Sequence, residues 1–128
     1  MLLSVGDVTV HAGIVITAAQ LREIVLSLPE VEERETWGHP TFRVRDKIFG
    51  SLSEDDQSGG FKATVEHQRE LVGADPGTYS VAAYTGRYGW VEVKLATADP
   101  DELRDIVVEA WRRTAPKRLV SVYDSASG

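Results

Sequence analysis

The sequence contains no cysteine and only one methionine among its 128 residues. Without thiols the chain cannot form disulfides, zinc–thiolate or iron–sulfur sites, or a cysteine nucleophile, so these classes of protein are excluded together. No apolar run approaches the roughly eighteen residues of a membrane-spanning helix. The apolar N-terminal residues lack the basic segment of a signal peptide. We therefore expect a cytoplasmic protein with no membrane partner.

A basic excess is also lacking. The chain has 14 Lys and Arg against 20 Asp and Glu, a formal charge of −6 and a pI of about 5.0. Five cations face ten acids before Gly60, and nine face ten from Gly60 onward. Neither half is a basic domain, and tight non-specific binding to DNA needs concentrated positive charge. The composition therefore leaves only a weak or local contact with nucleic acid open.

The motifs of common enzyme classes are missing too. His11, His39 and His67 lie far apart in the sequence, and none has a partner at metal-ligand spacing. The chain has no nucleophile elbow, no phosphate-binding loop and no dinucleotide-binding glycine motif. The acidic runs at 32–35 and 54–56 are typical of solvated surface. We expect no catalytic residues, no metal and no cofactor.

The hydrophobic periodicity predicts one α+β domain over residues 17–123. Residues 1–16 are interpreted as an N-terminal extension, either an edge strand or disordered, and residues 124–128 as a frayed tail. A capping box at Thr17–Gln20 begins the first helix, and an Asp99 cap followed by Pro100 begins the last long one. The expected helices are 18–28, 67–72, 100–115 and a short segment near 119–123.

Period-two alternation predicts strands at 41–45, 48–52, 61–65, 79–84 and 90–95. The first two would form a hairpin through a turn at Asp46–Lys47, and the last two would pair across the loop 85–89. The order is α-β(3)-α-β(2)-α. Helices that bury their apolar stripe on one face of an antiparallel sheet give a two-layer sandwich.

Strict alternation divides the side chains between two sheet faces. The apolar set, with Phe42, Ile48 and Phe61, would face the helices. The other face would carry four cations, one anion and two large aromatics among Thr41, Arg43, Arg45, Phe49, Ser51, Lys62, Thr64, Trp90, Glu92 and Lys94. Such a face is either ordinary solvated surface or a binding platform for a protein, a dimer mate or a nucleic acid.

Several short segments resemble the MmcQ/YjbR family. They are Leu28-Pro29-Glu30-Val31, the run TWGHPTFRV at 36–44, Lys47-Ile48-Phe49, the run GWVEV at 89–93, and the helix Leu103 to Trp111. The resemblance extends from about residue 17 to about residue 123. It implies a two-layer α-β(3)-α-β(2)-α fold and a DNA-binding function through a double-wing arrangement. It implies no catalytic residues.

Two binding hypotheses follow. In the first, hairpin tips contact DNA weakly and in a salt-dependent way. In the second, the chain is a non-enzymatic module that binds a protein, a second copy or a small ligand, on the face of Trp90, Phe49 and Arg43 or in a crevice near Trp37 and His39. A positive stripe joining the tips would favour DNA, and a concave aromatic pocket would favour a ligand. The candidate binding residues are Arg43, Arg45, Lys47, Arg87, Trp90 and Lys94.

Overall fold

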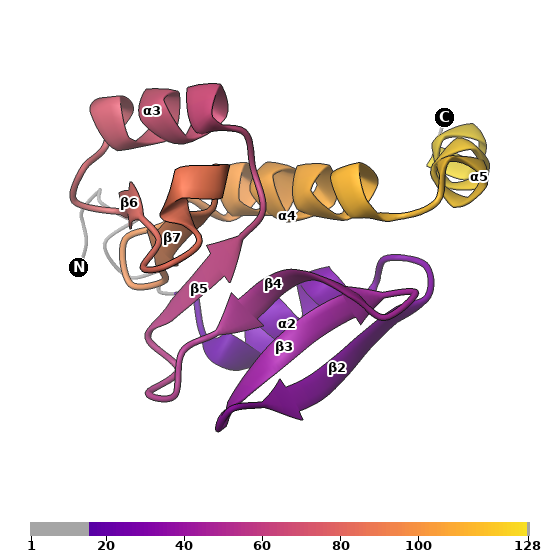
Figure 1. Ribbon diagram of the computed structural model, residues 1–128, viewed down its shortest axis with the longest axis horizontal. Helices are drawn as coiled ribbons and strands as arrows, with labels where there is room; N and C mark the ends of the chain where they lie inside the picture. Colours follow the sequence, from indigo (N-terminus) through magenta and orange to yellow (C-terminus); the bar gives the residue numbers. More distant parts are fainter. Residues whose placement is uncertain (1–15, 128) are drawn as a thin grey trace, which may run out of the picture.

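The computed structural model describes residues 16–127 and contains one six-stranded antiparallel sheet, with strand order β2-β3-β4-β5-β7-β6 (Figure 1). The extension expected at 1–16 lies outside the described residues, Ile16 excepted. The elements are α2 (Ala18–Leu26), β2 (Val31–Thr36), β3 (His39–Val44), β4 (Lys47–Leu52), β5 (Ser58–Phe61), α3 (Val65–Ala74), β6 (Tyr79–Val81), η2 (Gly86–Tyr88), β7 (Val91–Lys94), α4 (Pro100–Thr114) and α5 (Lys117–Ser127).

Helices α2 and α4 lie together against one side of the sheet (Figure 1). The expected two-layer α+β architecture is therefore confirmed. The predicted caps begin both helices, because Thr17 and Gln20 exchange side-chain-to-backbone hydrogen bonds at 2.9 and 3.1 Å and Asp99 accepts from the Glu102 amide at 3.0 Å. No helix among residues 16–127 is both long enough and apolar enough to cross a membrane.

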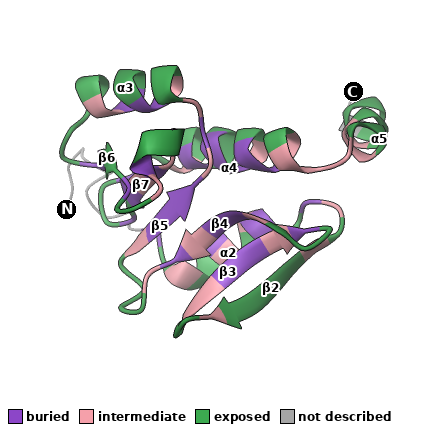
Figure 2. Ribbon diagram, in the orientation of Figure 1, coloured by how far each residue is buried: buried purple, intermediate pink, exposed green. Residues whose placement is uncertain are grey.

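The hydrophobic core fills the space between the sheet and these helices (Figure 2). Its largest side chain, Trp111 of α4, is fully buried, and its indole N–H donates to the Pro29 carbonyl at 3.1 Å. The Tyr123 ring of α5 meets Trp111 edge-on, with 5.1 Å between ring centroids. This ring contact attaches α5 to the C-terminal part of α4.

Strand β2 was not predicted. Its sequence, VEERET, lacks apolar alternation, and its four central residues are exposed. The acidic run that the sequence pattern assigns to solvated surface is therefore an exposed edge strand. Its charged side chains discourage pairing with another sheet. It pairs with β3 from Val31↔Val44 to Thr36↔His39.

A β-bulge in the β3–β4 hairpin corrects the predicted division of faces. Phe42 pairs with Gly50, and Arg43 pairs with Ile48, which leaves Phe49 as the extra residue. An extra residue reverses the alternation beyond it. Phe49 is therefore fully buried in the core, and Ile48 lies on the open face, the opposite of the prediction for both.

Four further predictions change in their boundaries. The tight turn of this hairpin is Arg45–Asp46, both at positive φ (51° and 67°), and not Asp46–Lys47. The third strand, predicted at 61–65, lies instead at Ser58–Phe61. It stops there because Thr64 caps α3 by accepting from the His67 amide at 3.0 Å. Strands β6 and β7 pair as predicted, over a shorter length. Residues 124–127, expected to fray, belong to α5.

Candidate functional site

A cavity of about 580 Å³ opens on the sheet face opposite α2 and α4. Its floor is one row of residues in register across four strands, namely Thr41, Ser51, Gly60 and Glu92. A Cβ atom on Gly60 would lie 3.4 Å from Ser51 Oγ and 3.5 Å from Glu92 Oε1. The missing side chain at Gly60 therefore keeps the middle of the floor low, while its neighbours supply polar atoms.

Three aromatic residues line the cavity: Trp37, Tyr84 and Trp90. Trp37 occupies the turn between β2 and β3 and is 85% exposed, and Tyr84, in the loop after β6, is 96% exposed. Because β2 and β6 are the two edge strands, these two aromatics come from opposite edges of the sheet. Both have left-handed backbones, with φ of 52° and 64°, which is uncommon outside glycine.

The loop that carries Tyr84 and Trp90 is held in place by α3. Gln68 is buried, and its amide nitrogen donates to the carbonyls of Gly86 at 2.8 Å and Trp90 at 2.7 Å. Gly89 has a φ of 100°, and a Cβ there would come within 2.7 Å of the Ala63 carbonyl oxygen. The loop therefore approaches the start of α3 too closely for any residue but glycine.

The charged lining of the cavity is acidic. Glu54 and Glu92 line it together with His39, and no Lys or Arg of the described chain does so. Glu92 Oε2 accepts a hydrogen bond from Ser58 Oγ at 2.5 Å. Glu54 Oε2 lies 3.2 Å from the position that a Cβ of Gly38 would take, so this carboxylate stands beside the Trp37–Gly38 turn. Residues 16–127 hold no cluster of three or more potential metal ligands.

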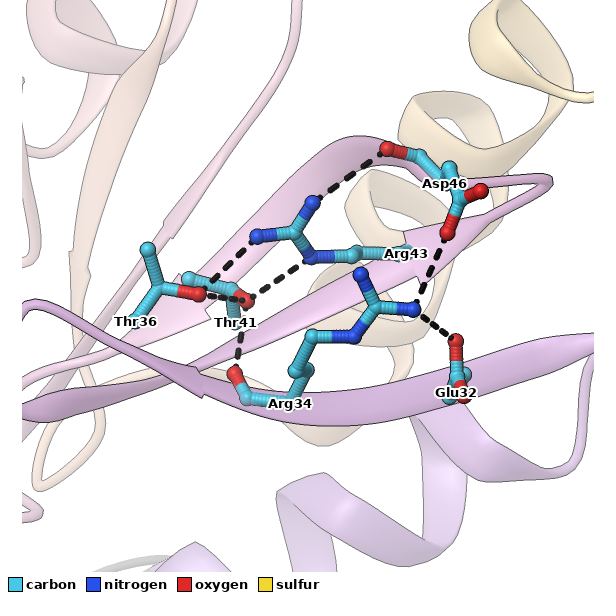
Figure 3. A network of polar contacts seen from close by, with 6 residues as sticks. All are labelled: Glu32, Arg34, Thr36, Thr41, Arg43 and Asp46. Atoms are coloured by element: carbon cyan, nitrogen blue, oxygen red, sulfur yellow. Dashed lines mark hydrogen bonds and ion pairs between the residues drawn. The ribbon is translucent and has the colours of Figure 1, made fainter.

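Arg43 belongs to a polar network beside the cavity floor (Figure 3). Its guanidinium donates to Thr36 Oγ1 at 2.9 Å, to Thr41 Oγ1 at 3.4 Å and to the Asp46 carbonyl at 3.3 Å. The Thr41 hydroxyl in turn donates to the Arg34 carbonyl at 2.7 Å. The network therefore holds Thr41 in a fixed position, with Arg43 itself outside the cavity lining.

The other predicted cations do not join the cavity. Arg45 pairs with Glu30, and this guanidinium lowers the pKa of the Glu30 carboxyl. Lys47 is exposed beside the β3–β4 turn. Arg87 of η2 lies 4.8 Å from the centroid of the Tyr88 ring. Lys94 lines a smaller hollow next to the cavity, together with Thr78 and Glu92. Of the six candidate residues, Trp90 alone lines the cavity.

Sequence reasoning placed a crevice near Trp37 and His39, and the structure has both in the cavity lining. It missed Tyr84, Glu54 and Gly60. Continuing the period-two pattern back from Phe61 would have put Gly60 on the open face. Glu54 sits in an acidic run that looks like any solvated loop, and no sequence signal marks the left-handed backbone at Tyr84.

Comparisons with known proteins place the chain in a family. Residues 26–113 match the family model described as YjbR. Uncharacterised proteins of Mycobacterium bovis and Mycobacterium tuberculosis are 34% identical over 58 residues, and the match covers 45% of this chain and 45% of each relative. The crystal structure of the Deinococcus radiodurans protein DR2400, of domain family DUF419, has a similar fold, with a TM-score of 0.69 at 20% identity over 76% of this chain and 77% of that one. The chain belongs to the YjbR family.

Proposed function

We propose that this protein is a non-catalytic binding module that takes up a small organic molecule in the cavity on the open sheet face. The observation that carries the proposal is the cavity itself, about 580 Å³ in volume and lined by Trp37, Tyr84 and Trp90. Small-molecule sites are typically concave, between about 300 and 1,000 Å³, with apolar and aromatic walls and a few polar groups. This cavity has each of these properties.

The polar floor supports recognition of a defined ligand. The Thr41 hydroxyl is fixed by its hydrogen bond to the Arg34 carbonyl, and Glu92 is oriented by Ser58. Polar groups that are already positioned lose little entropy when a ligand binds, which raises affinity. We therefore expect the site to be formed before the ligand arrives.

The proposal includes no chemical step. Nucleophilic catalysis needs a hydroxyl or thiol within hydrogen-bonding reach of a base. In the described chain, neither Ser51 nor Ser53 donates to His39, and the Ser53 hydroxyl donates to Asp55 instead, at 2.7 Å. We also propose a cytoplasmic setting, which the lack of cysteine supports.

The test is a screen of small organic molecules against ¹⁵N-labelled protein by ¹H–¹⁵N NMR. We expect hits to shift the amides of Thr41, Ser51 and Glu92 across the floor. Gly60→Val would fill the floor and abolish these shifts, and Gly60→Ala would weaken them. Gly73→Val is the matched control, because a Cβ at Gly73 of α3 meets nothing within 4 Å. Hits that persist unchanged in Gly60→Val, or that all map elsewhere, overturn the proposal.

Weak contact with duplex DNA through hairpin tips is the second candidate. It is favoured by Lys47 and Arg87, which form no ion pair within residues 16–127, and by the exposed ring of Tyr88 beside Arg87. It is weakened at the β3–β4 tip, where Arg45 is already paired with Glu30.

Fluorescence anisotropy of labelled duplex and single-stranded DNA at low salt tests this second candidate. We expect weak binding that falls steeply with added salt and disappears in the double variant Lys47→Glu/Arg87→Glu. Equal binding by that variant removes the hairpin tips from consideration. A second copy of the chain, packed on the sheet face, is an alternative occupant of the cavity. Sedimentation equilibrium at the NMR concentration would reveal such a homodimer.

A further inference from the structure

We infer that the ligand of this cavity is an organic cation: a small molecule that joins an ammonium group to an apolar or aromatic body. The inference rests on the proposed binding function and specifies its ligand class. Three features of the cavity lead to it, namely the sign of its charge, an unused acceptor on its floor and the aromatic residues around it.

The sign of the charge comes first. Glu54 and Glu92 both line the cavity, and no Lys or Arg of the described chain lines it with them. A concave site lined by one sign of charge focuses the electric field and raises the local concentration of the opposite sign. The cavity therefore attracts cations and repels carboxylates and phosphates.

The unused acceptor is Glu92 Oε1. The other oxygen of this half-buried carboxylate accepts from Ser58, whereas Oε1 accepts no hydrogen bond from any residue in 16–127. It lies beside the backbone of Gly60, with Ser51 Oγ on the other side. An ammonium group above Gly60 could donate to both oxygens, and a charge-assisted bond of this kind is about twice as strong as a neutral one.

The aromatic residues favour the same ligand. Trp90 and Trp37 line the cavity that contains the two carboxylates, and Tyr84 completes the rim. The faces of tryptophan and tyrosine rings attract cations, and tryptophan does so most strongly. The same rings cover an apolar body, so one molecule can satisfy the carboxylates and the aromatics together.

Neither carboxylate forms an ion pair with a Lys or Arg of residues 16–127. Arg43, two residues beyond Thr41 on β3, is bound to Thr36, Thr41 and the Asp46 carbonyl. Lys94, two residues beyond Glu92 on β7, is exposed and lines the adjoining hollow that Glu92 also lines. Neither cation lines the cavity itself. Within residues 16–127 the two carboxylates thus have no cation in direct contact. A carboxylate that is partly removed from water gains from a paired cation.

The test compares three probes of nearly equal shape: phenethylammonium, phenethyl alcohol and phenylacetate. NMR titrations of the wild type should give the tightest binding for the ammonium, with the alcohol weaker by about tenfold and phenylacetate weakest. Glu92→Gln should remove most of the preference for the ammonium, because it weakens binding of the ammonium far more than binding of the alcohol. Glu70→Gln, on the exposed side of α3, is the matched control and should bind as the wild type does.

The outcomes separate this inference from the proposal beneath it. Equal binding of the ammonium and the alcohol, or a preference that survives in Glu92→Gln, overturns the ligand class and leaves the cavity as a binding site. The absence of cavity shifts with phenethylammonium at its highest soluble concentration also overturns the ligand class. The binding function itself is overturned only if the library screen gives no hit whose binding is lost in Gly60→Val.

Discussion

The two faces of the sheet are built from the same strands, yet their side chains differ in kind. The covered face contributes Phe42, Phe49 and Phe61, all fully buried against α2 and α4. The open face contributes a row of small and polar residues, and the cavity lies above it. The contrast indicates that the cavity arises from the size of the residues in one register row.

Two glycines show how differently the faces use an absent side chain. A Cβ on Gly50 would lie 2.6 Å from two carbons of the buried Phe61 ring, whereas a Cβ on Gly60 would meet polar atoms at 3.4 Å or more. On the covered face the missing side chain makes room for an aromatic ring. On the open face it leaves room for solvent or a ligand.

Phe49→Ala should have the largest effect on stability. Phe49 is fully buried in the structure, although unbroken alternation would place it on the open face. Truncating a buried phenylalanine typically costs about 3–5 kcal/mol of unfolding free energy. Urea denaturation followed by far-UV circular dichroism measures this. A loss below about 0.5 kcal/mol, which is typical of a surface site, would contradict the bulge.

The bulge also shows what the sequence could and could not predict. Caps and apolar periodicity predicted α2 and α4, and the loop at 85–89 predicted the pairing of β6 with β7, because these signals are local. The prediction that Phe49 lies on the open face was wrong, because nothing in the run KIFGSL marks where the extra residue of the bulge enters. Strand β2 was missed, since an exposed edge strand has no apolar alternation to detect.

The site was predictable only in part, for a related reason. Trp37, His39 and Trp90 stand out as unusual residues near turns, and all three line the cavity. The floor depends on the register of four strands, which a sequence pattern does not specify. The ion pair that occupies Arg45 depends on the distant Glu30, so that cation looked available in the sequence.

The two glycines provide the second prediction. The same substitution, glycine to alanine, should change the stability of the fold in opposite directions on the two faces. Gly50→Ala should destabilise the fold by about 1–3 kcal/mol, because the Phe61 ring is enclosed in the core and cannot yield easily. Gly60→Ala should stabilise it by about 0.5–1 kcal/mol, because alanine loses less backbone entropy in a strand. Urea midpoints of the two variants measure both. Changes of the same sign would contradict the assignment of faces.

The third prediction concerns a polar pair on the covered side. Tyr79 of β6 is buried and donates to Glu102 of α4. Burial, reinforced by this hydrogen bond, raises the pKa of Tyr79 well above its usual value of 10. Above pH 10 the unfolded chain therefore ionises this tyrosine while the folded one does not. Stability should fall by up to about 1.4 kcal/mol per pH unit from this group.

The measurement is the unfolding free energy of the wild type and Tyr79→Phe between pH 8 and 11. The variant should start less stable, because it leaves Glu102 without its donor. Its curve should then decline less steeply above pH 10, where the wild type loses the contribution of Tyr79. Parallel curves would show that the pKa of Tyr79 is the same in the folded and unfolded states, which would contradict the raised value.

Trp37→Asn should have the smallest effect on stability, and it should stabilise the fold rather than destabilise it. Trp37 and Gly38 occupy the two central positions of a tight hairpin turn, with φ of 52° and 86°. Such turns favour Asn-Gly, and a left-handed backbone is unfavourable for a bulky residue. Because Trp37 is 85% exposed, its removal sacrifices little packing. We expect a gain of about 0.5 kcal/mol together with weaker binding of phenethylammonium.

Trp37→Ala serves as the control for this substitution, since alanine lacks both the ring and the asparagine preference for the left-handed region. Trp37→Ala should bind phenethylammonium as weakly as Trp37→Asn does, and it should be less stable than Trp37→Asn. A loss of stability in Trp37→Asn would mean that the tryptophan contributes to the fold. A gain in stability with a loss of binding would mean that an unfavourable backbone is retained for the aromatic side chain it presents, as expected where binding and stability conflict.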